Sequence, residues 1–171
     1  MSVRLVIDSL DFVQNAGIRH GKIPMVELVR LHDLLFDQEG ELTYRISGQF
    51  DKNTKPGLQL EAKGRIHLKC QRCLGELNYT IDLKTFLLLA KNETELHLAD
   101  EDDTIDAILA IPDLDVVNLI EDEVILSLPI SSRHADGECS TVKLKLAEDN
   151  LIGNKKSAHP FAVLATLKKT N

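Results

Sequence analysis

Residues 58–89 read LQLEAKGRIHLKCQRCLGELNYTIDLKTFLLL. Apolar and polar residues alternate on both sides of the Cys-x-x-Cys motif formed by Cys70 and Cys73, and a period of two is typical of half-buried strands. Two such runs with a short connection predict an antiparallel hairpin that carries the cysteine pair at its tip. We expect Gly75 to supply the positive φ of this tight connection.

The sequence before this hairpin predicts two further strands and a helix. Val3 to Ile7 is apolar enough for an opening strand, and alternation from Glu41 to Gly48 predicts another. Between them, apolar residues recur every three or four positions and predict an amphipathic helix over about 25–36 that packs inward. These residues are Met25, Leu28, Leu31, Leu34 and Leu35.

The sequence after the hairpin is more polar. The acid-rich residues 92–103 predict a mobile loop, and a short strand is expected within 105–111. Asp113 or Asp115 can cap a helix that ends at Pro129, with Glu121, Asp122 and Glu123 pointing outward. Residues 135–158 predict a partly flexible segment. The fold class expected is α+β in a single domain over 1–171: an antiparallel sheet with a Cys-x-x-Cys hairpin and flanking helices.

Charge is distributed unevenly along the 171 residues, whose net formal charge is −7. Residues 52–91 hold eight bases against three acids, whereas residues 92–149 hold sixteen acids against three bases. If the fold keeps these blocks apart, one surface suits phosphate and another suits a basic partner. If the blocks neutralise each other, the charge serves only solubility.

Three cysteines make an odd count, which fits a reducing compartment better than a set of disulfides. No apolar run approaches the roughly 20 residues that a membrane-spanning helix needs. The first residues also lack the long apolar region of a secretory signal. We therefore expect a cytoplasmic protein without a membrane partner.

The cysteines have the composition of a metal site. Cys70 and Cys73 form a chelating pair, and His134 with Cys139 would complete the Cys₃His set of a structural zinc site. His159 or His67 could take the place of His134, and the thiols could instead remain without metal. Thiol exchange is a further alternative, which the expected position between two strands disfavours because reactive pairs usually lie at a helix N-terminus.

No phosphate-binding glycine loop, nucleophile elbow or metalloprotease motif is present, so we expect neither an enzyme nor a small-molecule substrate. Cations in the strand-rich region could contact RNA phosphates: Lys63, Arg65, Lys69 and Arg72. Aromatic residues make up only 4% of the chain, which favours backbone recognition over base stacking. The acidic region could instead bind a basic protein.

Three stretches resemble the bacterial large ribosomal RNA subunit accumulation protein family, often called YceD. They are LKCQRCL at 68–74, VNLIEDEVILSLP at 117–129 and HPFAVLATLK at 159–168. The resemblance implies a non-catalytic role in synthesis, processing or stability of large-subunit (23S) ribosomal RNA, through pre-ribosomal particles or ribosomal proteins. It also favours His134 and Cys139 as the second pair of zinc ligands. A metal-stabilised protein adaptor without RNA contact remains the alternative.

Overall fold

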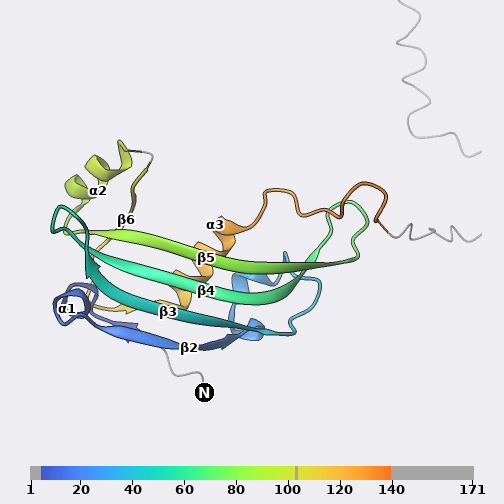
Figure 1. Ribbon diagram of the computed structural model, residues 1–171, viewed down its shortest axis with the longest axis horizontal. Helices are drawn as coiled ribbons and strands as arrows, with labels where there is room; N and C mark the ends of the chain where they lie inside the picture. The colour runs from blue at the N-terminus through green and yellow to red at the C-terminus, as the bar shows by residue number, and fades with distance from the viewer. Residues whose placement is uncertain (1–4, 103, 140–171) are drawn as a thin grey trace, which may run out of the picture. The chain divides into compact units, whose positions relative to one another are not determined.

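The computed structural model describes residues 5–102 and 104–139 and is built on a five-stranded sheet (Figure 1). The strand order is β2-β3-β4-β5-β6, in which the first four strands are antiparallel neighbours and β6 runs parallel to β5. The chain is α+β, as predicted. The bounds are β2 Ile18–Pro24, β3 Glu41–Phe50, β4 Pro56–Lys69, β5 Glu76–Ala90 and β6 Asp106–Leu109.

The strands on either side of the cysteine pair are the longest in the sheet. β4 and β5 pair antiparallel from Gly57 opposite Leu88 to Lys69 opposite Glu76. Residues 70–75 connect them, so the cysteines lie at one end of the sheet. The alternation in residues 58–89 therefore predicted this strand pair correctly, because over most of their length one side of each strand is more buried than the other, although residues 87–90 are buried on both sides.

Helix α3, Val116–Ser127, contacts β4 and β5 and crosses behind the sheet in the view of Figure 1. Asp115 caps it by accepting hydrogen bonds from the N–H groups of Val117 and Asn118 at 3.0 and 3.2 Å. Val116, Ile120 and Val124 are buried, as the predicted helix required. The helix ends at Ser127, and the residues that follow it run back toward the cysteines.

The start of the described chain packs at the far end of the sheet from the cysteines. β1, Val6–Ile7, pairs with β7, Leu114–Asp115, and α1, Ser9–Gln14, lies against β3. The approach is close, because a side chain at Gly48 would come within 2.6 Å of the Val13 backbone. Of the predicted opening strand from Val3, the first two residues lie outside the described part.

The prediction of an α-helix over residues 25–36 was wrong. The structure has two short 3₁₀ turns, η1 (Met25–Glu27) and η2 (Val29–Leu31). A 3₁₀ turn places every third residue on one side, so Met25, Leu28 and Leu31 can all be buried without an α-helix. Spacing of three therefore suited both conformations.

Glu121 contacts these 3₁₀ turns, and its position corrects a second prediction. It was expected to face outward, yet it is only 3% exposed. Its carboxylate accepts hydrogen bonds from the backbone N–H groups of Arg30 and Leu31 at 2.7 and 3.3 Å, and from Arg30 Nε at 3.0 Å. The Arg30 N–H thus donates to a side chain of α3, whereas the Leu31 N–H is shared between this carboxylate and the Leu28 carbonyl of its own turn at 3.2 Å.

The loop predicted over 92–103 was also wrong over its first part, which forms helix α2, Glu93–Asp100. Asn92 caps the helix by accepting from Glu95 N–H at 2.9 Å, while the Glu95 carboxylate accepts from Lys91 N–H at 2.9 Å. This is close to a capping box, a helix-start signal that the density of acids concealed. Of the segment predicted flexible at 135–158, only residues 135–139 are described.

Candidate metal centre

The connection between β4 and β5, residues 70–75, is a compact turn that we call the knuckle. Cys70 N–H donates to the Gly75 carbonyl at 2.9 Å, and Leu74 N–H donates to the Cys70 carbonyl at 2.8 Å. These two bonds close the turn from both ends. They leave the thiols of Cys70 and Cys73 facing a common volume together with His134 and Cys139.

The turn has a positive φ, but at a different residue from the one predicted. Leu74 has φ +59°, whereas Gly75 does not have a positive φ. A leucine in this conformation is strained by about 1–2 kcal/mol, because its Cβ crowds the following carbonyl. The knuckle is therefore held in a conformation that its own sequence does not favour, and contacts from elsewhere must stabilise it.

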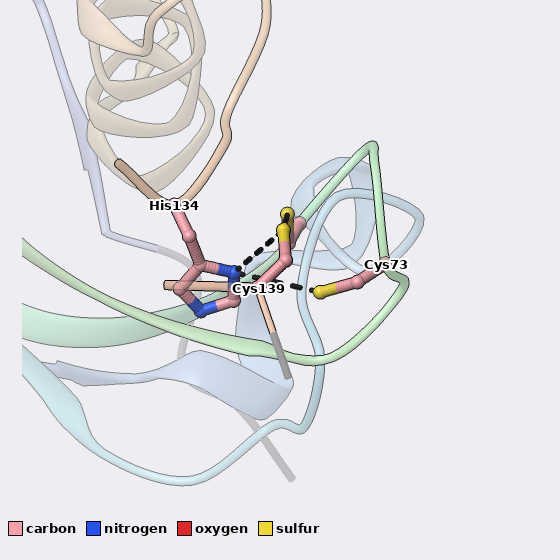
Figure 2. A group of neighbouring side chains, drawn as sticks. Cys73, His134 and Cys139 are labelled. Atoms are coloured by element: carbon pink, nitrogen blue, oxygen red, sulfur yellow. Dashed lines mark hydrogen bonds between the residues drawn. The ribbon is translucent and has the colours of Figure 1, made fainter. Parts of the chain in front are cut away.

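Those contacts come from residues 130–139, which we call the return segment because the chain runs back to the knuckle after α3. Gln71 N–H donates to the Ser132 carbonyl at 2.8 Å. The His134 ring contacts the Glu76 carbonyl through Nε2 at 2.8 Å, which makes Nε2 the protonated nitrogen. Nδ1 then carries the lone pair, and Figure 2 shows it directed toward the sulfur atoms of Cys73 and Cys139.

The four predicted ligands come together in the structure. Their ligand atoms all lie within 4.8 Å of one another. Cys70 Sγ is 3.8 Å from Cys139 Sγ, and His134 Nδ1 is 3.5 Å from Cys73 Sγ and 3.7 Å from Cys139 Sγ. Tetrahedral zinc, with bonds of about 2.3 Å to sulfur and about 2.0–2.1 Å to nitrogen, holds such atoms roughly 3.6–3.8 Å apart. The spacing thus fits a metal ion, and the three cysteines are free of disulfides.

The electrostatics of the cluster also suit a cation. Burial acts to raise the pKa of the Cys70 thiol, but N–H groups of Cys73, His134 and Arg72 outweigh it and lower this pKa to about 5. The Gly75 N–H favours a Cys73 thiolate, yet burial and the neighbouring sulfur atoms raise the pKa of Cys73. One thiolate thus forms readily while repulsion opposes the next. A divalent cation among the sulfur atoms would remove this repulsion.

His134 is held in an orientation that suits a fourth ligand. Its pKa is raised, first by its hydrogen bond with Cys139 and then by the Glu76 carbonyl. In zinc proteins a ligating histidine usually donates its other N–H to a carbonyl or carboxylate, which fixes the tautomer that binds metal. The Glu76 carbonyl takes this part here.

The four cations that were predicted to contact RNA have different surroundings in the structure. Lys63 forms an ion pair with Asp82 at 2.9 Å, and Arg72 turns toward Cys139, with Nε 2.9 Å from Sγ. Arg65 and Lys69 are exposed, and within residues 5–102 and 104–139 their side chains make no hydrogen bond or ion pair. His67, considered as a ligand, instead contacts Asp37 at 2.9 Å, and His159 lies outside the described residues.

Sequence reasoning missed the residues that support the ligands. Gln71 holds the return segment through its backbone N–H and through its side-chain amide, which contacts Ile130 and Ser131. Arg72 did give a signal, since a guanidinium between two cysteines is well placed to stabilise a thiolate. Its assignment to RNA overlooked that its guanidinium would contact Cys139 and Asp136, which lie 67 and 64 residues further along the chain.

No solved structure matches the chain. A family model described as "Large ribosomal RNA subunit accumulation protein YceD" matches residues 58–168. The match begins with β4 and includes the knuckle, α3 and the return segment, so all four members of the cluster lie within it. The chain belongs to the YceD family.

Proposed function

We propose that this protein is a non-catalytic cytoplasmic factor in the synthesis, processing or stability of large-subunit (23S) ribosomal RNA, acting through ribosome assembly. The observation that carries this proposal is the family membership, since the family description names accumulation of the large ribosomal RNA subunit. In the described ranges, none of the helices is long and apolar enough to cross a bilayer.

We propose further that Cys70, Cys73, His134 and Cys139 hold one Zn²⁺ in a structural site. The spacing of the ligand atoms and the raised cost of a second thiolate support this proposal. With four protein ligands no position stays open for substrate, which distinguishes structural from catalytic zinc. The ion would supply a cross-link between the knuckle and the return segment and would take part in no turnover.

Among the described residues, Arg65 and Lys69 are the best placed for direct RNA contact. Both are exposed on β4, in the strand that leads to the knuckle, and both lack an ion-pair partner among the described residues. Lys63 and Lys84 are less available, because Asp82 and Glu61 neutralise them at 2.9 Å. Unpaired cations gain more from a phosphate than cations that must first leave a carboxylate.

Deletion of the gene followed by complementation tests this proposal. We expect cells without the protein to accumulate less mature large-subunit RNA, and the double variant Arg65→Glu, Lys69→Glu to restore it poorly and to bind pre-ribosomal particles weakly. The matched control is Lys52→Glu, Lys55→Glu, which makes the same charge change at the β3–β4 turn. Unchanged RNA levels after deletion would contradict the function, and equal behaviour of the two double variants would contradict the contact.

A groove between α3 and β6 favours a second candidate, a protein adaptor that binds a basic ribosomal protein. The groove has a volume of about 500 Å³ and is lined by apolar residues, including Leu119 and Leu126, of which Leu126 is 78% exposed. Burial and then the nearby Asp106 and Asp122 raise the pKa of Glu123 at its edge. A lysine or arginine beside an apolar side chain of the partner would relieve this repulsion.

Leu126→Glu and Arg65→Glu separate the two candidates. An adaptor without RNA contact should retain ribosomal proteins after nuclease treatment, lose them through Leu126→Glu, and show no salt-sensitive binding to isolated RNA. A direct RNA factor should show affinity that falls steeply with salt and is weakened by Arg65→Glu. Retention of the same ribosomal proteins by the Leu126→Glu variant would exclude the groove as the docking surface.

A further inference from the structure

The Arg72 side chain makes four polar contacts, all with the return segment. Nε donates to Cys139 Sγ at 2.9 Å, and Nη1 donates to Asp136 Oδ1 at 3.0 Å. Nη2 donates to the carbonyls of Ala135 and His134 at 3.0 and 3.3 Å. The planar guanidinium thus contacts a ligand sulfur and the backbone that leads to it from a residue lying between the first two cysteines.

The net charge of the metal-loaded cluster is one reason why an arginine suits this position. Three thiolates and a neutral imidazole around a divalent ion leave one negative charge in excess, and a cation in direct contact lowers its cost in this partly exposed cluster. A guanidinium has a delocalised positive charge and donors fixed in a fork, so it can offset the charge and orient several acceptors at once. Lysine has the charge without the fork, and glutamine has neither the charge nor five donors.

The position of Arg72 between the two segments is a second reason. The knuckle and the return segment are far apart in sequence, and Cys139 lies at the end of the described part of the return segment. Gln71 ties the knuckle to Ser132 and, through Ser131, to the residues before His134. Arg72 contacts the residues from His134 onward. It is therefore placed to bring the last ligand, Cys139, to the other three.

We propose that Arg72 is a positioning residue of the metal centre, which neutralises the Cys139 thiolate and closes the return segment over the ion. This inference rests on the zinc site proposed above. It assigns Arg72 to metal retention and removes it from the RNA-contacting residues. Partners of ligands in metal sites typically change affinity by about 10–100-fold when they are mutated.

The experiment compares zinc release from the full chain in the wild type, Arg72→Lys and Arg72→Gln, with a colorimetric chelator in excess. We expect release from Arg72→Gln to be at least about tenfold faster than from the wild type, and Arg72→Lys to lie between them. Arg45→Gln is the control, because Arg45 is an exposed arginine of β3 without polar contact to the cluster among the described residues. It should release zinc at the wild-type rate.

Cobalt-substituted protein provides a readout that a general loss of stability would not produce. Loss of the hydrogen bond to Cys139 should shift the thiolate-to-cobalt absorption of Arg72→Gln to longer wavelength, because a bare thiolate gives up electron density more easily. Release and spectra equal to the wild type would contradict the role of Arg72 while leaving the zinc site intact. A wild-type chain that retains no zinc would contradict the zinc site and, with it, this inference.

Discussion

The apolar face of the sheet and the knuckle with its return segment both join distant parts of the chain, but by different means. The sheet face buries leucines and isoleucines from β3, β4 and β5 against α3, so its stability is shared among many contacts. The knuckle and the return segment meet through four ligand atoms, one backbone hydrogen bond, the side chain of Gln71 and one guanidinium. The first region should tolerate gradual change, whereas the second should depend on whether one ion is present.

Removal of the metal should produce the largest difference between the two regions. Zinc binding contributes about 10–16 kcal/mol in zinc-finger peptides, so the variant Cys73→Ser or a strong chelator should release the return segment entirely. We expect hydrogen exchange at the amide of Gln71, which donates to Ser132, to become much faster. Amides shared between β3 and β4 serve as the control, and equal acceleration in both places would mean that the regions are not independent.

A cavity in the sheet face should show the opposite behaviour. Leu60→Ala removes a fully buried side chain and should lower the free energy of unfolding by about 2–5 kcal/mol. Zinc content should stay at the wild-type level, because Leu60 lies well before the knuckle on β4. Denaturant unfolding and metal analysis of the same sample measure both quantities, and a parallel loss of zinc would show that the centre depends on the sheet core.

The contact between Glu121 and the 3₁₀ turns is intermediate, since one buried carboxylate holds two segments. Glu121→Ala should cost about 1–3 kcal/mol, because the Arg30 N–H loses its acceptor and the Leu31 N–H keeps only the Leu28 carbonyl. Asp122→Ala is the matched control: it removes the exposed carboxylate 2.5 Å from the same arginine and should cost less than about 1 kcal/mol. If thermal unfolding shows that both variants lose the same stability, the buried Glu121 carboxylate contributes no more than the exposed Asp122.

The smallest effect should come from His67 and Asp37. The hydrogen bond with Asp37 raises the pKa of His67 above 6.5, and the Glu39 N–H followed by His67 lowers that of Asp37 below 3.8. The histidine contribution is complete below pH 6.5 and is lost as the pH rises through its raised value. The aspartate contribution is complete above 3.8 and is lost as the pH falls through its lowered value.

The pair should therefore stabilise the fold most between about pH 4 and 6.5. Melting temperatures of the wild type and His67→Gln, measured across pH at saturating zinc, should differ most in this window and converge at alkaline pH. Because both proteins carry the same metal ligands, pH effects on zinc cancel in the difference. A difference that grows at alkaline pH would have the wrong sign for a histidine stabilised by a carboxylate.

The contrast also explains what could be read from the sequence. Alternation in residues 58–89 and the spacing of Val116, Ile120 and Val124 predicted strands and a helix because each pattern matches one conformation. The spacing of Met25, Leu28 and Leu31 matched two, and the contact of this segment with the distant Glu121 could not be read from that spacing. The four ligands could be named from their chemistry, but the contacts of Arg72 and the αL conformation of Leu74 depend on a segment that arrives from elsewhere in the chain.

X-ray absorption at the zinc edge of the freshly purified full chain tests the central claim most directly. We predict about one zinc per chain with three sulfur neighbours near 2.3 Å and one nitrogen near 2.0–2.1 Å. The sulfur count should fall to two in Cys139→Ser. A chain purified without zinc, or a metal surrounded mainly by oxygen and nitrogen, would contradict the claim that these four side chains join the knuckle to the return segment.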